Sequence, residues 1–434
     1  MSIIGIGLAA GTGERAYPLS RKGRTYFKSK AVIPFLGRYT IKWVLDDFKA
    51  QGVTEYHIIT KGVENYDQIK GALGFGDKRG LKIGYSRIDD DDTNRGSGDA
   101  LLTNLERFDV NNSALVFPVD SIYDLDLQAA YKFHKEKEAV VTIAGFYCSV
   151  RSIVGKYGFM VTDGGNMVTD FHEKPKDFEE IIKYYSNVNP SDIEHLTLIV
   201  NSGAYLFDSK KLREISNLDD VRKMRQKRLD IGGDLIPWLV EHDYKVSDFR
   251  IPRYGDLGTP YDYLETMKRC LSGEFESIER IGIGDVFDSG KRLFIDETSL
   301  EMKDGKTGKT LLKKIECGDV VLEKNVRIGS YVEVHPGVKL SNCNVSDDTI
   351  LCDNVTIINS EINQRCLIGE SASIEQSIIG LNTRVRSSKE NSTKLSIGFV
   401  GDDSEIGEGS KISNSLIPPK GIVTPGQDVI NVSL

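Results

Sequence analysis

Short apolar runs alternate with longer amphipathic segments along the first part of the chain. The apolar runs have the length of strands, whereas the longer segments repeat apolar residues at helical spacing. In chain order, these alternating strand and helix candidates are residues 3–8, 41–51, 56–60, 66–73, 114–119, 127–137 and 139–146. Alternation of this kind is typical of βαβ units. We therefore predict an α/β fold, with a mostly parallel sheet covered by helices on both faces.

A different pattern begins near residue 315, where the helix signals end. Val320, Val326, Val332 and Val338 recur every six residues, a spacing that suits neither an α-helix nor a hairpin. Three similar tripeptides, at 343–345, 360–362 and 377–379, lie 17 residues apart, which is close to three hexapeptides. The two nested periods predict a parallel β-helix whose coils bury a column of aliphatic side chains. Ordinary antiparallel structure is the alternative, and the polar run 386–396 is predicted to be a loop extruded from one coil.

Length and composition narrow the class of protein. A chain of 434 residues exceeds what one hydrophobic core usually organises, so we predict domains at 1–270 and 315–434 joined by a linker at 271–314. The net charge of −8 argues against a nucleic-acid partner, and no apolar run approaches the length of a membrane span. The six cysteines include no C-x-x-C pair and are predicted to be reduced core residues, so we expect a soluble cytoplasmic protein. We expect the acidic run Asp89–Asp92 to be a solvated loop.

The loop after the first apolar run has the composition of an anion site. In the stretch GLAAGTGERAYPLS, at positions 7–20, Gly11 and Gly13 allow close approach of backbone N–H groups, and Arg15 offers a planar donor pair to phosphate. The stretch also fits a loose dinucleotide-binding fingerprint. Pro18 interrupts the helix that this fingerprint requires, and no suitably placed acidic residue follows to hold a ribose. A plain glycine turn with a surface arginine is a further alternative.

Eight motifs along the chain, taken together, resemble those of one enzyme family, the sugar-1-phosphate nucleotidyltransferases, and within it the glucose-1-phosphate adenylyltransferases. They occur in the order that the family shows, and they are LAAGTGERAYPL at 8–19, KAVIPF at 30–35, RGSGDA at 95–100, VDSIY at 119–123, FHEKP at 171–175, NSG at 201–203, DIGGDLIP at 230–237 and DLGT at 256–259.

The resemblance implies a fold and a reaction. The fold is a Rossmann-like nucleotidyltransferase domain followed by a left-handed parallel β-helix of hexapeptide repeats. The reaction is Mg²⁺-dependent attack of a sugar-1-phosphate on the α-phosphorus of a nucleoside triphosphate, with ATP and glucose-1-phosphate as the expected pair. Other pairs with UTP or GTP and with mannose- or N-acetylglucosamine-1-phosphate, a catalytically silent regulatory subunit, and a nicotinamide-dependent oxidoreductase stay open. The family also implies a homo-oligomer, a dimer or tetramer, assembled through the β-helix.

The resemblance assigns catalytic and metal-binding roles to four charged residues. Arg15, Lys30 and Asp120 are the expected catalytic residues, and Asp120 and Asp256 are the expected Mg²⁺ ligands. Two carboxylates together with substrate phosphates and water suit this cation. On the sequence alone, Asp120 could equally begin a turn, and Lys30 could be one of several solvated cations.

Substrate-binding residues follow from the same motifs. The expected nucleotide-binding residues are Leu8, Ala9, Ala10, Gly11, Thr12, Gly13, Gly96, Ser97, Gly98 and Asp99, and the expected sugar-phosphate-binding residues are Gly158, Glu173, Lys174, Asn201, Ser202 and Gly203. The glycine loop at 96–100 could be a simple turn, and Glu173 with Lys174 an exposed charge pair before a proline. Glu14, Ala31 and Thr40 depart from the family pattern, so the motifs leave more than one base and sugar open.

Overall fold

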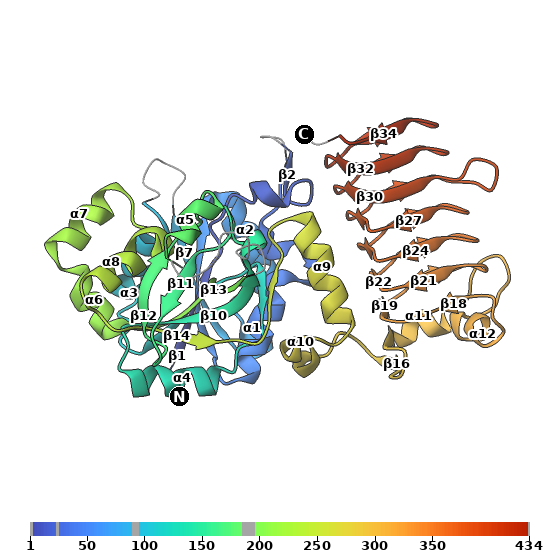
Figure 1. The fold of residues 1–434 in the computed structure, drawn as a ribbon. Coiled ribbons are helices and arrows are strands. Elements are labelled where there is room, and N and C mark those ends of the chain that lie inside the picture. The colour runs from blue at the N-terminus through green and yellow to red at the C-terminus, as the bar shows by residue number, and fades with distance from the viewer. Residues whose placement is uncertain (1–2, 23–25, 89–94, 185–195, 433–434) are drawn as a thin grey trace. The chain divides into compact units, whose positions relative to one another are not determined.

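The computed structural model describes residues 3–22, 26–88, 95–184 and 196–432 (Figure 1). The acidic run Asp89–Asp92 lies outside the described residues. By packing, the chain forms two compact units: unit 1 comprises Met1–Gly11, Val44–Val119 and Tyr123–Tyr254, and unit 2 comprises Thr12–Trp43, Asp120–Ile122 and Gly255–Leu434. This division differs from the sequence-based boundaries, because residues 12–43 and 120–122 pack with the C-terminal part of the chain.

Unit 1 is built on a sheet of nine described strands. The order is β12-β11-β13-β8-β1-β6-β7, and β10 joins β13 to β14. The strands are β1 (Ile3–Leu8), β6 (Glu55–Lys61), β7 (Lys82–Ile88), β8 (Ser113–Pro118), β10 (Val141–Ser149), β11 (Phe159–Thr162), β12 (Val168–His172), β13 (Thr197–Asp208) and β14 (Val246–Arg250).

The sheet of unit 1 is parallel in one part and mixed in the other. Strand β1 pairs in parallel with β6 and β8, β6 with β7, and β10 with β14. Strand β13 runs antiparallel to β8, β10 and β11. The fold is therefore a mixed α/β fold with a sheet rich in parallel pairs, and the predicted parallel alternation holds for its first strands.

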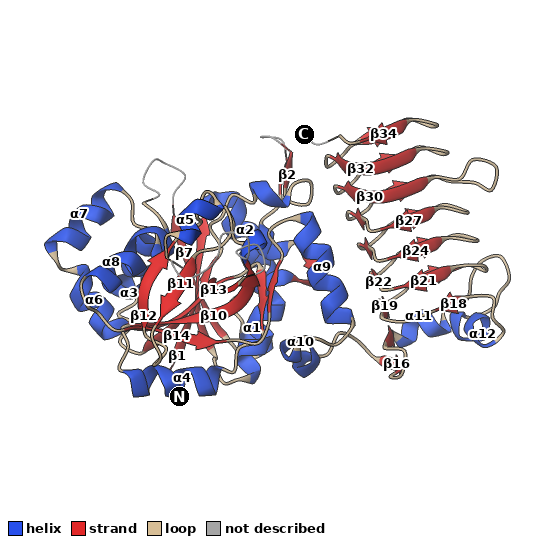
Figure 2. Ribbon diagram, viewed as in Figure 1, coloured by secondary structure: helices blue, strands red, loops and turns tan. Residues whose placement is uncertain are grey.

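The helices predicted for the first part of the chain lie close to α1 (Thr40–Ala50), α2 (Gly62–Leu73) and α4 (Leu127–Lys137). The helices that the sequence pattern did not predict are α3 (Ser97–Arg107), α5 (Phe178–Ile182), α6 (Ser209–Ser216), α7 (Asp219–Lys227) and α8 (Ile236–Glu241). The apolar strands are buried because helices cover the sheet: Ile6, Val116, Val141 and Phe207 are fully buried in one core. Figure 2 shows the helices of this unit beside its strands.

The C-terminal part of unit 2 is a stack of short parallel strands. These strands are β18 (Val321–Leu322), β19 (Val326–Ile328), β20 (Glu333–Val334), β21 (Lys339–Ser341), β22 (Cys343–Val345), β23 (Ile350–Leu351), β24 (Thr356–Ile358), β25 (Glu361–Ile362), β26 (Leu367–Ile368), β27 (Ser373–Glu375), β28 (Ile378–Ile379), β29 (Arg384–Val385), β30 (Lys394–Val400), β31 (Glu405–Ile406), β32 (Lys411–Ile417), β33 (Ile422–Val423) and β34 (Asp428–Ile430).

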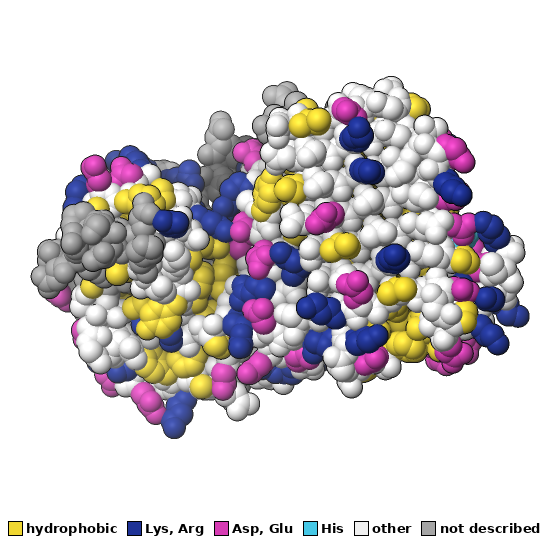
Figure 3. Space-filling view, turned by 45° about the vertical axis from the view of Figure 1, so that its right-hand side comes forward, with side chains coloured by type: hydrophobic (Ala, Val, Ile, Leu, Met, Phe, Trp, Pro, Cys, Tyr) yellow, Lys and Arg dark blue, Asp and Glu magenta, His cyan; other side chains and the backbone are white. Residues whose placement is uncertain are grey.

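Residues 17 apart pair in this stack, as the sequence period predicts. Val326 pairs with Cys343, and Asn344 with Glu361. The valines of the six-residue series are buried in a single aliphatic core, which explains the period: one valine of the series points inward every six residues. The result is a curled, parallel sheet structure. On the face that Figure 3 shows, acidic and basic side chains are interspersed along the coils.

The predicted loop at 386–396 is shorter than expected. Strand β30 begins at Lys394, so the last three residues of the predicted loop are strand. Across this loop the pairing offset rises from 17 to 21 residues, as in Ile378 with Phe399. The coil therefore holds four extra residues, and the offset of 17 returns between β30 and β32.

Asparagines form corners of the coils. Asn325, Asn342, Asn359, Asn414 and Asn431 all have φ between 45° and 55°, in the left-handed region. Asparagine tolerates this conformation better than most side chains. Asn325 also donates to the side-chain oxygen of Asn342, its neighbour in the next coil, at 2.8 Å. The asparagines 17 residues apart, at 325, 342 and 359 and again at 414 and 431, are a signal of these corners in the sequence.

The predicted linker at 271–314 is folded. It holds the end of α9 (Pro260–Leu271), then α10 (Glu276–Ile281), β16 (Val286–Asp288), β17 (Leu293–Ile295), α11 (Glu297–Glu301) and the start of α12 (Leu311–Glu316). Strand β17 pairs in parallel with β19, so the stack of strands begins before residue 315.

The structure bears on two predictions from composition, one about the cysteines and one about membrane-spanning segments. Cys270, Cys343 and Cys366 are buried, but Cys317 is exposed, so the prediction that all six cysteines are core residues is wrong. None of the helices in the described ranges has the length and hydropathy that a membrane crossing requires.

A buried polar network links the coils to the rest of unit 2. Arg327 donates through Nη1 to Asn344 Oδ1 at 2.9 Å and through Nε to the carbonyl of Ile283 at 2.7 Å. Its guanidinium also fills the space beside Gly37, where a side chain would clash with it. Asn344 Nδ2 donates to Glu361 Oε1 at 2.6 Å. Burial raises the pKa of Glu361 to about 8, although Asn344 and Arg327 oppose this shift.

We expect Glu361→Gln to reduce the loss of stability that the protein shows as pH rises. The folded-state pKa of Glu361 lies above its ordinary value, so the folded protein holds a proton that the unfolded chain releases. The contribution of this proton to the free energy of unfolding is fully present below about pH 4.5 and is lost as the pH rises to about 8. Urea unfolding at several pH values measures the effect, on the order of a few kcal/mol. A difference between wild type and variant that does not change with pH would contradict the prediction.

Candidate functional site

The loop after β1 contains two glycines with different structural constraints. Gly13 has φ of 75°, and a Cβ there would lie 3.2 Å from Ser20 Cβ and 3.4 Å from Lys30 Cγ. Around Gly11, nothing in the described part of the chain lies within 4 Å of a built Cβ. The fold therefore requires glycine at position 13 but leaves open space at position 11. Such space beside a loop of backbone donors suits close approach of a ligand.

We expect Gly11→Ala to weaken ligand binding without loss of stability, and Gly13→Ala to lower stability. Gly11→Ala should fold with a melting temperature close to that of the wild type and raise the KM for the predicted nucleotide substrate about tenfold, because the added methyl occupies the open space. Gly13→Ala should lose about 1–2 kcal/mol of stability, because alanine is strained at positive φ. Thermal unfolding and steady-state kinetics measure the two effects. Equal loss of stability in both variants would contradict this interpretation of Gly11.

Lys30 and Asp120, both in unit 2, form an ion pair. Lys30 begins the short 3₁₀ helix η2 (Lys30–Val32), and Asp120 lies between β8 and β9 (Ser121–Tyr123). Lys30 Nζ lies 3.2 Å from Asp120 Oδ2, and the side chains are 14% and 24% exposed. The structure therefore brings together the predicted catalytic lysine and carboxylate in a partly desolvated position, where charge interactions are stronger than in water.

Arg15 and Asp256 both lie next to Gly258 in unit 2. Arg15 belongs to the short 3₁₀ helix η1 (Glu14–Ala16), and Asp256 ends β15 (Tyr254–Asp256), the strand that pairs with β9. The backbone N–H of Gly258 donates to Asp256 Oδ1 at 2.7 Å. Arg15 Nη2 lies 3.5 Å from the position that a Cβ of Gly258 would take. The predicted arginine and second carboxylate are therefore near each other.

Two carboxylates of unit 2, Asp120 and Asp256, have the type of oxygen donor that magnesium prefers. Within the described ranges, no cluster of three or more His, Cys, Asp or Glu side chains could hold a metal ion. Asp120 and Asp256 offer hard oxygen ligands next to Lys30 and Arg15, which can hold phosphates. Mg²⁺ is commonly held by one or two carboxylates, with substrate phosphates and water completing its shell, so this donor set fits it.

Glu173 sits in a cradle of two glycines in unit 1. Gly158 precedes β11, and Glu173 follows β12, its antiparallel neighbour. A Cβ on Gly158 or on Gly232 would lie 2.6 Å from Glu173 Oε2. Any side chain larger than hydrogen at either position would displace the carboxylate. The side chain of Glu173 is 27% exposed, so its carboxylate remains accessible.

Asn201 lies beside the same cradle and is held on three sides. Its backbone N–H donates to the carbonyl of Gly158 at 2.8 Å, its Oδ1 accepts from the N–H of Gly203, and its Nδ2 donates to the Tyr205 hydroxyl at 2.7 Å. Burial raises the pKa of Tyr205, and the Glu173 carboxylate adds to this increase. The predicted sugar-pocket residues Gly158, Glu173 and Asn201 therefore lie together.

The other predicted sugar-site residues flank this group. Lys174 has φ of 45°, a strained conformation for a lysine, and its Nζ lies 3.3 Å from Glu173 Oε1 with the side chain 53% exposed. Ser202 Oγ accepts from the N–H of Ala204. Gly203, at φ of 83°, packs against Pro118. Backbone strain at an exposed, charged residue is common at functional sites, and Lys174 shows it here.

The predicted base-binding loop packs closely against a neighbouring segment of unit 1. A Cβ on Gly96 would lie 2.5 Å from the carbonyl of Leu229, and Gly98 donates to that carbonyl at 2.7 Å. Ser97 N–H donates to Asp230 Oδ1 at 3.0 Å, while Asp99 pairs with Arg225 at 2.7 Å. These contacts explain the glycines structurally. The nucleotide-binding role of this loop stays a prediction.

Sequence reasoning did not single out Gly232 and Tyr205, which lie against the predicted sugar-site residues Glu173 and Asn201. Gly232 belongs to the DIGGDLIP motif at 230–237, whose residues are not among the predicted site residues. A signal for Gly232 therefore existed. Tyr205 lies four residues after Asn201 in β13, and nothing in the sequence pattern indicated that its hydroxyl accepts from that side chain.

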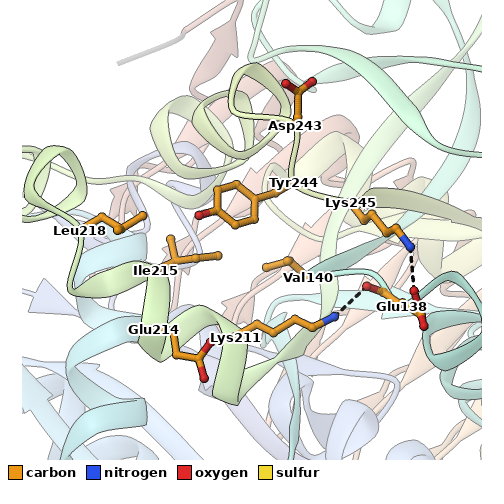
Figure 4. Close-up of a pocket in the computed structure, with 9 residues that line it drawn as sticks. All are labelled: Glu138, Val140, Lys211, Glu214, Ile215, Leu218, Asp243, Tyr244 and Lys245. Atoms are coloured by element: carbon orange, nitrogen blue, oxygen red, sulfur yellow. Dashed lines mark hydrogen bonds and ion pairs between the residues drawn. The ribbon is translucent and has the colours of Figure 1, made fainter.

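A separate pocket of about 430 Å³ lies elsewhere in unit 1, and no residue that lines it was predicted as a site residue (Figure 4). Glu138 accepts from Lys211 Nζ through its carbonyl at 2.9 Å and from Lys245 through its carboxylate at 2.8 Å. The two lysines that line this pocket therefore both bond to Glu138.

Comparison with known proteins identifies relatives across most of the chain. Residues 4–273 match the family described as nucleotidyl transferase. The chain is 25% identical over 385 residues to a UTP–glucose-1-phosphate uridylyltransferase of Synechocystis sp., covering 86% of each chain. It is 23% identical over 411 residues to a glucose-1-phosphate adenylyltransferase of Thermodesulfovibrio yellowstonii, covering 86% of this chain and 90% of that one. It is also 25% identical over 391 residues to the enzyme of that name from Deinococcus deserti, with 80% and 86% covered.

Proposed function

Since the chain belongs to the nucleotidyl transferase family and its relatives transfer nucleotidyl groups to sugar-1-phosphates, we propose that it joins ATP to glucose-1-phosphate and releases pyrophosphate. In this reaction, an oxygen of the sugar phosphate attacks the α-phosphorus of the triphosphate. The new P–O bond forms as the bond to the pyrophosphate oxygen breaks. Both reactants are polyanions, so catalysis depends mainly on charge neutralisation and alignment.

The single observation that supports this proposal best is the Lys30–Asp120 ion pair at 3.2 Å. A lysine held beside a carboxylate is already oriented when substrates arrive, so little reorganisation is needed in the reaction. In this proposal Lys30 contacts phosphate oxygens, and Arg15 holds the triphosphate with two parallel hydrogen bonds. The open space at Gly11 lets the phosphates approach the N–H groups of the loop.

Asp120 and Asp256 are the residues that would hold Mg²⁺. The ion, when bound, supplies positive charge to phosphate oxygens as negative charge develops on them. Gly258 orients Asp256 through the bond from its N–H. Lys30, which lies 3.2 Å from Asp120 Oδ2, would contribute its positive charge to the phosphates beside this ion.

Glu173, Lys174 and Asn201 are proposed to bind the sugar phosphate. Glu173 accepts hydrogen bonds from sugar hydroxyls, since its carboxylate is held by the two glycines and remains accessible. Lys174 pairs with the phosphate. Asn201, fixed by Gly158, Gly203 and Tyr205, shapes the wall of the pocket.

UTP is the second candidate nucleotide, because the uridylyltransferase relative covers as much of this chain as the adenylyltransferases do. A panel of ATP, UTP, GTP, CTP and dTTP against glucose-1-phosphate, mannose-1-phosphate and N-acetylglucosamine-1-phosphate tests both. The readout is pyrophosphate, converted to phosphate by pyrophosphatase. We expect release with ATP and glucose-1-phosphate. Release with UTP alone would replace the proposed nucleotide, and release with no pair would overturn the function.

We propose that the coils form a left-handed β-helix through which the chain assembles as a dimer or tetramer. The outer end of the stack exposes Ile422 and Ile430, at 75% and 54%. We expect light scattering to give an oligomeric mass for the wild type and a smaller mass for Ile422→Lys/Ile430→Lys, because charge opposes burial of this end. A monomeric wild type, or an unchanged mass in the variant, would contradict this surface.

A further inference from the structure

The carboxylate of Asp402 contacts two side chains from the segment that leads to Lys30. Asp402 follows β30 in the coils. Its Oδ2 accepts from the Tyr26 hydroxyl at 2.5 Å and pairs with the Lys28 ammonium. Asp402 is 4% exposed and the Lys28 side chain 14%, so the pair is largely shielded from water. Interactions of this kind are stronger than those of surface ion pairs, and removing one partner leaves the other charge uncompensated.

The coils hold Asp402 in a fixed place. Its Oδ1 accepts from the N–H of Leu381 in the preceding coil at 2.9 Å, and its carbonyl accepts from the N–H of Lys420 in the following coil at 2.7 Å. A Cβ on Gly380 would lie 2.6 Å from Asp402 N, so the adjacent coils are in close contact at this point. Asp402 is thus attached to the stack on both sides.

The segment that Asp402 holds is also tied to the loop after β1. Lys28 N–H donates to the carbonyl of Ser20 at 2.5 Å, and Ser20 Oγ donates to the carbonyl of Gly13 at 2.6 Å. Val32 N–H donates to the carbonyl of Ser29 at 3.0 Å, which closes the turn that begins at Lys30. One residue separates Lys28 from Lys30. A shift of Lys28 therefore moves Lys30 relative to Asp120.

We propose that Asp402 is a positioning residue for Lys30. Through Tyr26 and Lys28, the coils fix the place from which the Lys30 side chain reaches Asp120 and the phosphates. This inference rests on the proposed function for the role of Lys30. It adds that a residue of the coils, nearly 400 positions away in the sequence from the loop after β1, determines the geometry of that lysine.

Asp402→Asn in the full chain tests the proposal. Asparagine can still accept from Leu381, but it lacks the charge that pairs with Lys28. We expect kcat to fall about ten- to a hundredfold, because small misplacements of a catalytic group have effects of that size. The KM for glucose-1-phosphate should change less than about twofold, because the proposed sugar-site residues belong to unit 1, whereas Asp402 and Lys28 belong to unit 2. Lys28→Met and the double variant should show the same loss of kcat as Asp402→Asn, since the two residues act as a pair.

Asp403→Asn is the matched control. Asp403 is the adjacent residue of the same coil and accepts from Asn382 Nδ2 at 2.9 Å, so its substitution removes a charge and keeps a similar contact. We expect wild-type kcat from this variant. Amide hydrogen exchange at Lys28 and Val32 should accelerate in Asp402→Asn and stay unchanged in Asp403→Asn.

The outcomes distinguish this inference from the proposed function. Wild-type kcat and exchange in Asp402→Asn would overturn the positioning role, as would an equal loss of kcat in Asp403→Asn. Accelerated exchange throughout the coils would also overturn it, because the effect would then be general unfolding. If the wild type releases no pyrophosphate with any substrate pair, the proposed function fails, while exchange at Lys28 and Val32 still shows whether Asp402 holds this segment.

Discussion

Asp120→Asn should fold like the wild type and lose about a hundred- to a thousandfold in kcat. In the proposed site, the neutral amide would weaken the binding of Mg²⁺, and it removes the charged partner of Lys30, which lies 3.2 Å away. Both effects act where charge develops on the α-phosphate. Pyrophosphate release at saturating substrates and at increasing Mg²⁺ measures the loss.

Glu138→Gln is a suitable control for Asp120→Asn. Glu138 also pairs with a lysine, Lys245, at 2.8 Å, but it belongs to the separate pocket of unit 1. Its loss should leave kcat unchanged. Near-normal turnover of Asp120→Asn at high Mg²⁺ would remove Asp120 from the proposed site.

Lys174→Gln should raise the KM for glucose-1-phosphate about ten- to a hundredfold and lower kcat much less. If Lys174 holds the sugar phosphate equally in the ground state and the transition state, its loss removes binding that both share. A charge-assisted contact contributes about 1.5–3 kcal/mol, which corresponds to that change. The KM for the nucleotide should stay nearly constant, and titration of each substrate in turn measures both constants.

Lys132→Gln provides the comparison for Lys174→Gln. Lys132 is exposed and pairs with Glu136 at 3.8 Å along α4, so its loss reports the effect of removing any surface lysine. We expect no change in either KM. An equal rise for both substrates in Lys174→Gln, or no rise for either, would show that the resemblance of the FHEKP motif to the family pattern is misleading.

Local patterns predicted the first strands and helices well because their cause is local. The run at 3–8 is β1, and the segment at 127–137 is α4 with the same bounds. The 17-residue period also predicted the pairing of the coils, since each coil stacks on the next. The antiparallel place of β13 was not predictable in this way, because it depends on pairing with strands far away in the sequence.

The sequence predicted which residues belong to the candidate site, but it did not predict the contacts that hold them in place. Lys30 and Asp120 were chosen from separate motifs, and their ion pair follows only from the fold. The contact of Asp402 with Lys28 joins residues that no spacing rule connects. The predicted boundaries at 270 and 315 follow from the change from alternating apolar and amphipathic segments to a six-residue repeat. Packing also places residues 12–43 with the coils.

The stack of coils also sets a length. Arg327 lies beside Gly37 near one end, and Asp402 holds Tyr26 and Lys28 farther along the stack. Four steps of strand pairing, from β19 through β22, β25 and β28 to β30, separate the coils to which these residues belong. At about 4.8 Å per step, this places the two attachment points about 19 Å apart. The number of coils between Arg327 and Asp402 therefore fixes the distance between the two attachment points. Deleting one complete coil would preserve the packing between the remaining coils but bring Arg327 and Asp402 about 4.8 Å closer together. The contact of Arg327 with Gly37 and the contact of Asp402 with Lys28 could then not form at the same time.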